Sequence, residues 1–170
     1  MATVSEFNEN LKVDFGDGTT IVLKKPNRAV LGQMLAATRR DPLGAADVIL
    51  SQCIVEGDKR IKENTGYCHQ LLKVMDELFN KQVCLIDFES GNAEILFADD
   101  LKCTLRPATR SEYSAAQAAS RINPLRYIED LLRKCWIEGD EEIKASSGHL
   151  LGLAEVMDEF VSYTGEKLKN

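Results

Sequence analysis

Repeated acidic residues are the first candidates for chemistry in this chain of 170 residues. The triplet Glu-Gly-Asp occurs at 56–58 and again at 138–140. Paired carboxylates can bind a divalent cation or act as general acid and base. A glycine followed by an aspartate is also typical of a helix end followed by the cap of the next turn. We interpret both triplets as such helix punctuation and predict neither a metal site nor catalytic carboxylates.

Histidine and cysteine form no catalytic pattern in the sequence. His69 and His149 occupy different places in the internal repeat described below, because His69 aligns with Leu151 and His149 with Tyr67. The sequence has no phosphate-binding loop, dinucleotide-binding glycine pattern, nucleophile elbow or zinc-protease motif. We therefore predict that the protein is not an enzyme and uses no cofactor.

The cysteines predict buried, reduced thiols. They are odd in number and contain no C-x-x-C pair, which argues against a disulfide framework and a zinc site. The five are Cys53, Cys68, Cys84, Cys103 and Cys135.

Charge and hydropathy exclude several kinds of partner. The chain has 27 acidic and 21 basic residues, so its net charge is −6, which opposes a general nucleic-acid or anionic-membrane surface. No apolar run approaches the roughly 18 residues that a membrane span needs, and residues 1–10 do not resemble a signal peptide. We expect a cytoplasmic protein with no nucleic-acid and no membrane partner.

The sequence contains an internal repeat, and the fold of its two copies determines where the acidic residues, histidines and cysteines lie. When the sequence is shifted by 82 positions, 15 of the 38 residues in 42–79 are identical to those in 124–161. Tandem copies of a module are expected to fold as successive units. We therefore divide the chain into a first repeat unit (1–80), a junction with a possible strand (81–91) and a second repeat unit (92–170).

Each repeat is predicted to begin with a β-hairpin. Residues 11–15 alternate between apolar and polar side chains, and residues 20–23 are β-branched or apolar. Residues 16–18 supply a glycine-rich turn between them. Residues 93–97 and 101–105 are their counterparts. With the helices that follow, the predicted fold class is mainly α (α+β), with two tandem repeats that each consist of a hairpin and three to four helices.

Capping residues and apolar spacing predict the helices. Asp41 and Asn123 each precede a proline, a pair typical of a helix start. The residues that follow carry apolar side chains at i, i+3, i+4 and i+7. These positions are Leu43, Ala46, Ile49, Leu50 and Cys53, and Leu125, Ile128, Leu131, Leu132 and Cys135. The other predicted helix starts are Asn27, Ser111, Thr65 and Ser147.

The only tryptophan suggests a contact surface. Trp136 occupies the place of Ile54 in the other repeat, and it either packs in the core or anchors a partner together with Ile137. The candidate partner-binding residues are Trp136, Ile137, Tyr113 and Ile54.

The order of motifs resembles that of small phage and prophage tail assembly chaperones. In each copy an apolar strand precedes a basic residue and proline, an arginine, a helix, Asp/Asn-Pro-Leu and a helix ending in a Cys-x-x-Glu-Gly-Asp segment. The pieces are 24–28, 41–43 and 53–58 in the first copy, and 105–110, 123–125 and 135–140 in the second. The resemblance spans 21–79 and 103–161. The family usually has one copy, whereas this chain has two.

The resemblance implies a non-enzymatic protein of the bacterial host cytoplasm. Such chaperones coat the apolar tape-measure protein before the tail tube polymerises, often as oligomers, so tape-measure and tail-tube proteins are the expected partners and a homo-oligomer is an open possibility. The alternatives are a structural or adaptor protein of phage origin that uses tandem modules for avidity, and an enzyme with duplicated acidic sites.

Overall fold

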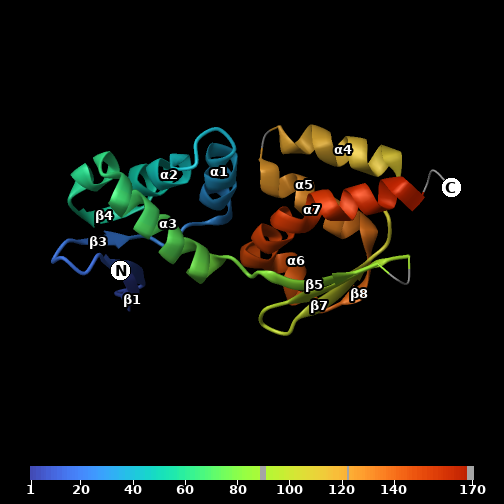
Figure 1. Ribbon diagram of the computed structural model, residues 1–170, viewed down its shortest axis with the longest axis horizontal. Helices are drawn as coiled ribbons and strands as arrows, with labels where there is room; N and C mark the ends of the chain where they lie inside the picture. The colour runs from blue at the N-terminus through green and yellow to red at the C-terminus, as the bar shows by residue number, and fades with distance from the viewer. Residues whose placement is uncertain (89–90, 122, 168–170) are drawn as a thin grey trace. The chain divides into compact units, whose positions relative to one another are not determined.

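The chain folds into two units, Met1–Leu78 and Phe79–Asn170, each with its own sheet and helices (Figure 1). The structure is a computed structural model. It describes residues 1–88, 91–121 and 123–167, with all of their side chains except those of 59 and 162–167. Among these residues no helix has both the length and the apolar character that crossing a bilayer requires.

Unit 1 contains a four-stranded antiparallel sheet in the order β1-β2-β3-β4. In β2, Leu11 and Val13 are buried while the intervening Lys12 is half-buried, as alternation along a strand requires. One face of the sheet therefore belongs to the core and the other remains open. The strands are β1 (Thr3–Phe7), β2 (Asn10–Asp14), β3 (Thr20–Leu23) and β4 (Ile54–Gly57).

The helices of unit 1 supply the rest of its core. Asn27 caps the first helix by accepting a hydrogen bond from the Val30 N–H at 3.0 Å, as predicted. Ile49 and Leu71 are fully buried. The elements are α1 (Arg28–Thr38), α2 (Gly44–Gln52), the 3₁₀ helix η1 (Lys59–Glu63) and α3 (Thr65–Phe79).

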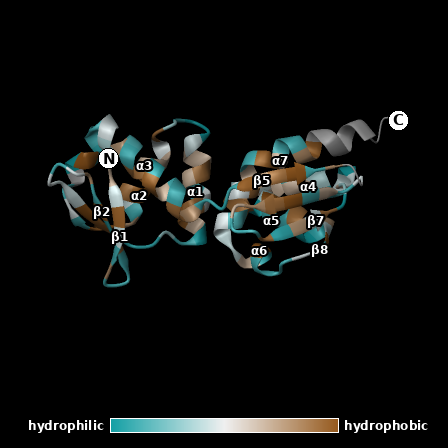
Figure 2. Cartoon of the chain, turned by 60° about the horizontal axis from the view of Figure 1, so that its bottom comes forward, coloured by the Kyte–Doolittle hydropathy of each residue, from teal (hydrophilic) through white to brown (hydrophobic). Residues whose placement is uncertain are grey.

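Unit 2 also has an antiparallel sheet, in the order β5-β6-β7-β8. Its helices lie on one side of the sheet (Figure 1). Figure 2 shows hydrophobic and hydrophilic bands along α7, as expected of a helix with one buried side. The elements are β5 (Val83–Asp87), β6 (Ala93–Phe97), β7 (Lys102–Leu105), α4 (Arg110–Ser120), α5 (Pro124–Cys135), β8 (Trp136–Gly139), α6 (Glu142–Ala145) and α7 (Ser147–Lys167).

The predicted fold class is wrong. The protein is α+β: of the residues described with their side chains, 52% are in helices and 23% in strands, and the described strands form two four-stranded sheets where we expected two hairpins. The expected strand pairs are β2 with β3 and β6 with β7, each the middle of a larger sheet. Two of the unexpected strands, β4 and β8, directly follow a helix, where the apolar stripe predicts only the helix end. Two tandem hairpin-helix repeats therefore do not describe this architecture.

Several helix starts also differ from the prediction. Asn123 caps α5 as predicted, and Pro124 is its first residue. The cap of α4 is Thr109, two residues before the predicted Ser111, because Thr109 forms a reciprocal capping box with Glu112. The side chains that accept hydrogen bonds from the first turns of α3 and α7 come from Asn64 and Ser146, one residue before the predicted Thr65 and Ser147.

Candidate partner-binding surface

The Glu-Gly-Asp triplets end strands and not helices, contrary to the prediction. Gly57 and Gly139 have φ of +117° and +137°, a region that glycine enters without strain. A Cβ at Gly139 would lie 2.5 Å from the Lys102 carbonyl oxygen, and one at Gly57 would lie 2.8 Å from that of Thr20. Glycine is therefore required where β8 and β4 meet their neighbouring strands.

The aspartates of the two triplets accept hydrogen bonds from different parts of their units. Asp58 caps η1 as predicted, accepting from the Arg60 N–H at 2.9 Å. Its hydrogen bonds from the Arg60 side chain, followed by this backbone bond, lower its pKa to about 2. The Asp140 carboxylate accepts from the Lys102 N–H at 2.8 Å, so it binds the neighbouring strand and does not cap α6, whose N-cap is Glu141.

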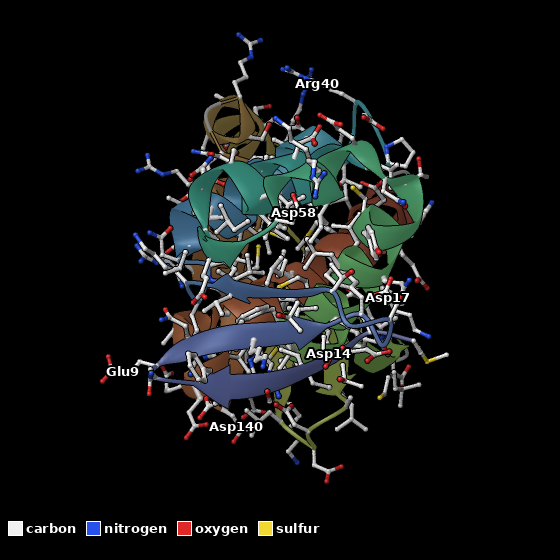
Figure 3. The ribbon with its side chains drawn as sticks, turned by 90° about the vertical axis from the view of Figure 1, so that its left-hand side faces the viewer. Glu9, Asp14, Asp17, Arg40, Asp58 and Asp140 are labelled. Carbon is white, nitrogen blue, oxygen red and sulfur yellow. The ribbon has the colours of Figure 1, made fainter. Side chains whose placement is uncertain are left out.

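Four acidic residues of unit 1 lie in different parts of that unit. Figure 3 places Glu9 at one end of the sheet, Asp14 and Asp17 at the other end, and Asp58 among the helices. In the described part of the chain, no three histidine, cysteine or acidic side chains are grouped so that they could hold a metal ion.

Tyr67 and His149, which align in the repeat, make similar contacts in their respective units. The Tyr67 hydroxyl donates to Asp17 at 2.5 Å, and its ring packs edge-on against Phe15. His149 is 3% exposed, and its Nε2 lies 3.2 Å from both carboxylate oxygens of Asp99. Its ring packs edge-on against Phe97. Both aromatic rings therefore join a helix to the end of a hairpin.

The thiols are buried with one exception. Cys53, Cys68, Cys103 and Cys135 are buried as predicted, whereas Cys84 on β5 is exposed. Burial raises the pKa of Cys103 to about 12 and that of Cys135 to about 11. These two thiols stay protonated at neutral pH and are poor nucleophiles.

Trp136 and Ile137 point to opposite sides of β8. Trp136 pairs with the buried Leu105, and Lys144 Nζ lies 4.0 Å from the centre of its half-buried ring, a cation–π contact. Ile137 is 47% exposed and lies at the irregularity in the β7–β8 pairing. Only Ile137 of this pair is therefore available on the open side of the sheet.

The other two candidates lie elsewhere. Tyr113 is on α4, where its ring packs against that of Tyr127 at 6.2 Å and its hydroxyl accepts from Gln117 at 2.9 Å. Ile54 is in unit 1, where it lines a hollow of about 650 Å³ together with Val48. Tyr113 and Ile137 thus lie on different elements of unit 2, and Ile54 belongs to the other unit.

The open face of the unit 2 sheet carries a pair of leucines and, beyond Glu138 on β8, an exposed isoleucine. Leu85 is 58% exposed and pairs across β5 and β6 with the half-buried Leu96. These two leucines and Ile137 line one hollow of about 700 Å³. We call the residues that line this hollow and face outward the outer face: Leu85, Leu96, Ile137, Asp87, Glu94, Lys102, Thr104 and Glu138.

The sequence analysis did not identify Leu85 and Leu96 as candidate contact residues, although the sequence contains a weak sign of both. In 93–97 the inward residues are Ala93, Ile95 and Phe97, so alternation predicts a polar residue at position 96. A leucine at position 96 departs from the pattern of a strand with one face exposed to solvent. Similarly, β5 has apolar residues at successive positions.

Comparisons with known proteins identify no relative. No protein-family model, no curated protein and no solved structure matches the chain.

Proposed function

We propose that this chain is a non-enzymatic tail assembly chaperone of a phage or prophage, which acts in the bacterial host cytoplasm and binds apolar helical segments of a tape-measure-type protein. The observation that carries the proposal is the set of apolar side chains that line the hollow of the outer face, Leu85, Leu96 and Ile137. The motif order in the sequence supports the choice of family.

The dimensions of the outer face suit a helix. Four strands spaced about 4.8 Å apart form a surface about 14 Å wide, and an α-helix with its side chains is about 10–12 Å across. Covering an exposed leucine or isoleucine contributes about 1.5–3 kcal/mol at most. A few such side chains therefore give a reversible complex, which a chaperone needs in order to release its client.

The first test is co-expression of the full chain with an apolar tape-measure fragment that is insoluble alone. We expect the wild-type chain to keep the fragment soluble and Leu85→Asp to lose most of this effect, because it places a charge on the binding surface. Val55→Asp is the matched control, since Val55 is a comparably exposed (53%) strand residue of unit 1. A fragment that remains insoluble with the wild-type chain refutes the proposal.

A second candidate is a structural or adaptor protein of phage origin. It is favoured by the exposed apolar residues on both sheets, Phe7 and Val55 in unit 1 and Leu85 and Ile137 in unit 2. An adaptor should lose binding of its partner with Val55→Asp as well as with Leu85→Asp, because avidity requires both contacts. The gene order separates the two candidates further, since a chaperone gene is expected between the tube and tape-measure genes.

A further inference from the structure

The outer face is acidic as well as apolar. Around its hollow lie three acidic side chains, Asp87, Glu94 and Glu138, and one basic side chain, Lys102. Glu94, Glu138 and Lys102 are exposed. In the sheet register Asp87, Glu94, Thr104 and Glu138 form one row across the four strands, and Leu85, Leu96 and Lys102 form the neighbouring row. A molecule that covers Leu85 and Leu96 therefore meets an excess of negative charge along one side, next to the acidic row.

The corresponding face of unit 1 has a different charge. Lys12 and Glu56 line its hollow, at the sequence positions that correspond to Glu94 and Glu138. One basic and one acidic residue thus replace two acidic ones. The hollow itself is smaller, about 160 Å³, and Phe7 lines it. Among the residues that line the two hollows, an excess of acidic side chains is therefore found only in unit 2.

We propose that the outer face of unit 2 selects a basic amphipathic helix, that is, a segment whose apolar side chains are flanked by lysine or arginine. This inference rests on the proposed chaperone function and specifies the chemistry of the partner segment. Leu85, Leu96 and Ile137 provide the apolar contact, and the acidic side chains determine which apolar helices are accepted.

The physical basis is electrostatic complementarity at the edge of an apolar contact. Opposite charges there raise the association rate and fix the orientation, while like charges disfavour the wrong partner. Exposed ion pairs contribute little individually, about twofold to fivefold in affinity each. With Glu94 and Glu138 acting together, we expect roughly tenfold discrimination, which salt screens because the Debye length falls to about 3 Å at 1 M.

Two synthetic helical peptides test the inference. Both carry the same leucine face, and one has lysine and the other glutamate at the flanking positions. Binding to the full-length chain is measured by fluorescence anisotropy at 50 mM and at 1 M salt. We expect the lysine peptide to bind roughly tenfold more tightly at 50 mM, with a much smaller difference at 1 M.

Reversing the charges of Glu94 and Glu138 tests whether the preference between the two peptides arises at the outer face. The double variant Glu94→Lys, Glu138→Lys should invert the preference between the peptides, and Leu85→Asp should weaken both. Glu56→Lys in unit 1 is the matched control, and it should leave the preference unchanged. Circular dichroism verifies that each variant is folded.

Three results would overturn the inference. Equal binding of the two peptides, still dependent on Leu85, removes the charge preference but leaves the chaperone function standing. If neither peptide binds while the tape-measure fragment is still kept soluble, the face is not a site for basic helices. Finally, gel filtration that shows a dimer dissociated by Leu85→Asp, with neither peptide competing, would mean that a second copy of the chain covers the face.

Discussion

At the scale of single residues, Tyr67 and His149 occupy equivalent positions in the two units and make similar contacts with different polar groups, a phenol hydroxyl and an imidazole nitrogen. Each ring packs against a phenylalanine and directs a polar atom at an aspartate. In unit 2, burial alone raises the pKa of Asp99, but the hydrogen bond and charge of His149, together with the charge of Lys81 at 3.7 Å, lower it by more. The pKa of Asp99 therefore lies below its ordinary value.

The contact of His149 can be tested with two substitutions. His149→Phe keeps the ring but removes its hydrogen bond to Asp99, and we expect a loss of about 1 kcal/mol in the free energy of unfolding. His149→Tyr reproduces the side chain found at position 67, so it should lose less. Urea unfolding at pH 7 followed by Trp136 fluorescence measures both values. Equal losses would show that the hydrogen bond contributes nothing.

At the scale of elements, the start of α4 is tied to two other segments. Glu112 accepts from the Thr109 N–H at 2.9 Å within the capping box. Arg106, just after β7, donates to both carboxylate oxygens of Glu112 at 3.0 and 2.7 Å and to the Lys134 carbonyl on α5 at 2.6 Å. A single arginine thus links a strand end, a helix start and a helix end.

This arrangement predicts a pH dependence. The Arg106 hydrogen bonds, followed by that of the Thr109 backbone, lower the pKa of Glu112 from 4.5 to about 2. Because the folded pKa is depressed, the stabilisation is complete above about pH 4.5 and is lost as the pH falls towards 2. Glu112→Gln should therefore lower the Tm at pH 7 and cause a much smaller difference near pH 2.

The control for this experiment is Glu159→Gln, which removes one exposed carboxylate of α7. Differential scanning calorimetry from pH 2 to pH 7 should give nearly the same curve for Glu159→Gln and the wild type. A Glu112→Gln curve that runs parallel to the wild-type curve over the whole range would contradict the argument.

At the scale of the whole molecule, each unit has its own buried core. Ile21, Ile49 and Leu71 are buried in unit 1, and Phe97 and Leu131 in unit 2. The chain's single tryptophan is in unit 2, so its fluorescence reports on that unit, whereas circular dichroism reports on both. Separate cores are expected to respond separately to local damage.

Alanine at the two strand-end glycines tests this independence. Each substitution forces a side chain into positive φ and against a neighbouring strand, so we expect a loss of more than about 2 kcal/mol in the affected unit. Gly139→Ala should shift the Trp136 fluorescence midpoint in urea, and Gly57→Ala should shift only the circular dichroism curve. A Cβ at Gly18 would meet no atom within 4 Å, so Gly18→Ala reports the φ strain alone. If Gly57→Ala moves the fluorescence midpoint equally, the units unfold together.

The extent of the sheets could not be predicted because it depends on distant partners. The strand β4 has four residues and follows α2 after Cys53, so nothing local separates it from the end of that helix. Its strand character comes from pairing with β3, in which Val22 lies opposite Glu56. The same holds for β8, which pairs with β7. Non-local pairing of this kind leaves little trace in a short segment.

By itself, the sequence determined the helix that starts at Pro124, its apolar stripe and the central strand pairs, because caps, turns and periodicity act over a few residues. Only the tertiary structure decided that Trp136 lies on the inner side of β8 while Leu85 and Ile137 stay exposed. Which face of a sheet stays open depends on where the helices pack, and that packing joins residues far apart in the chain.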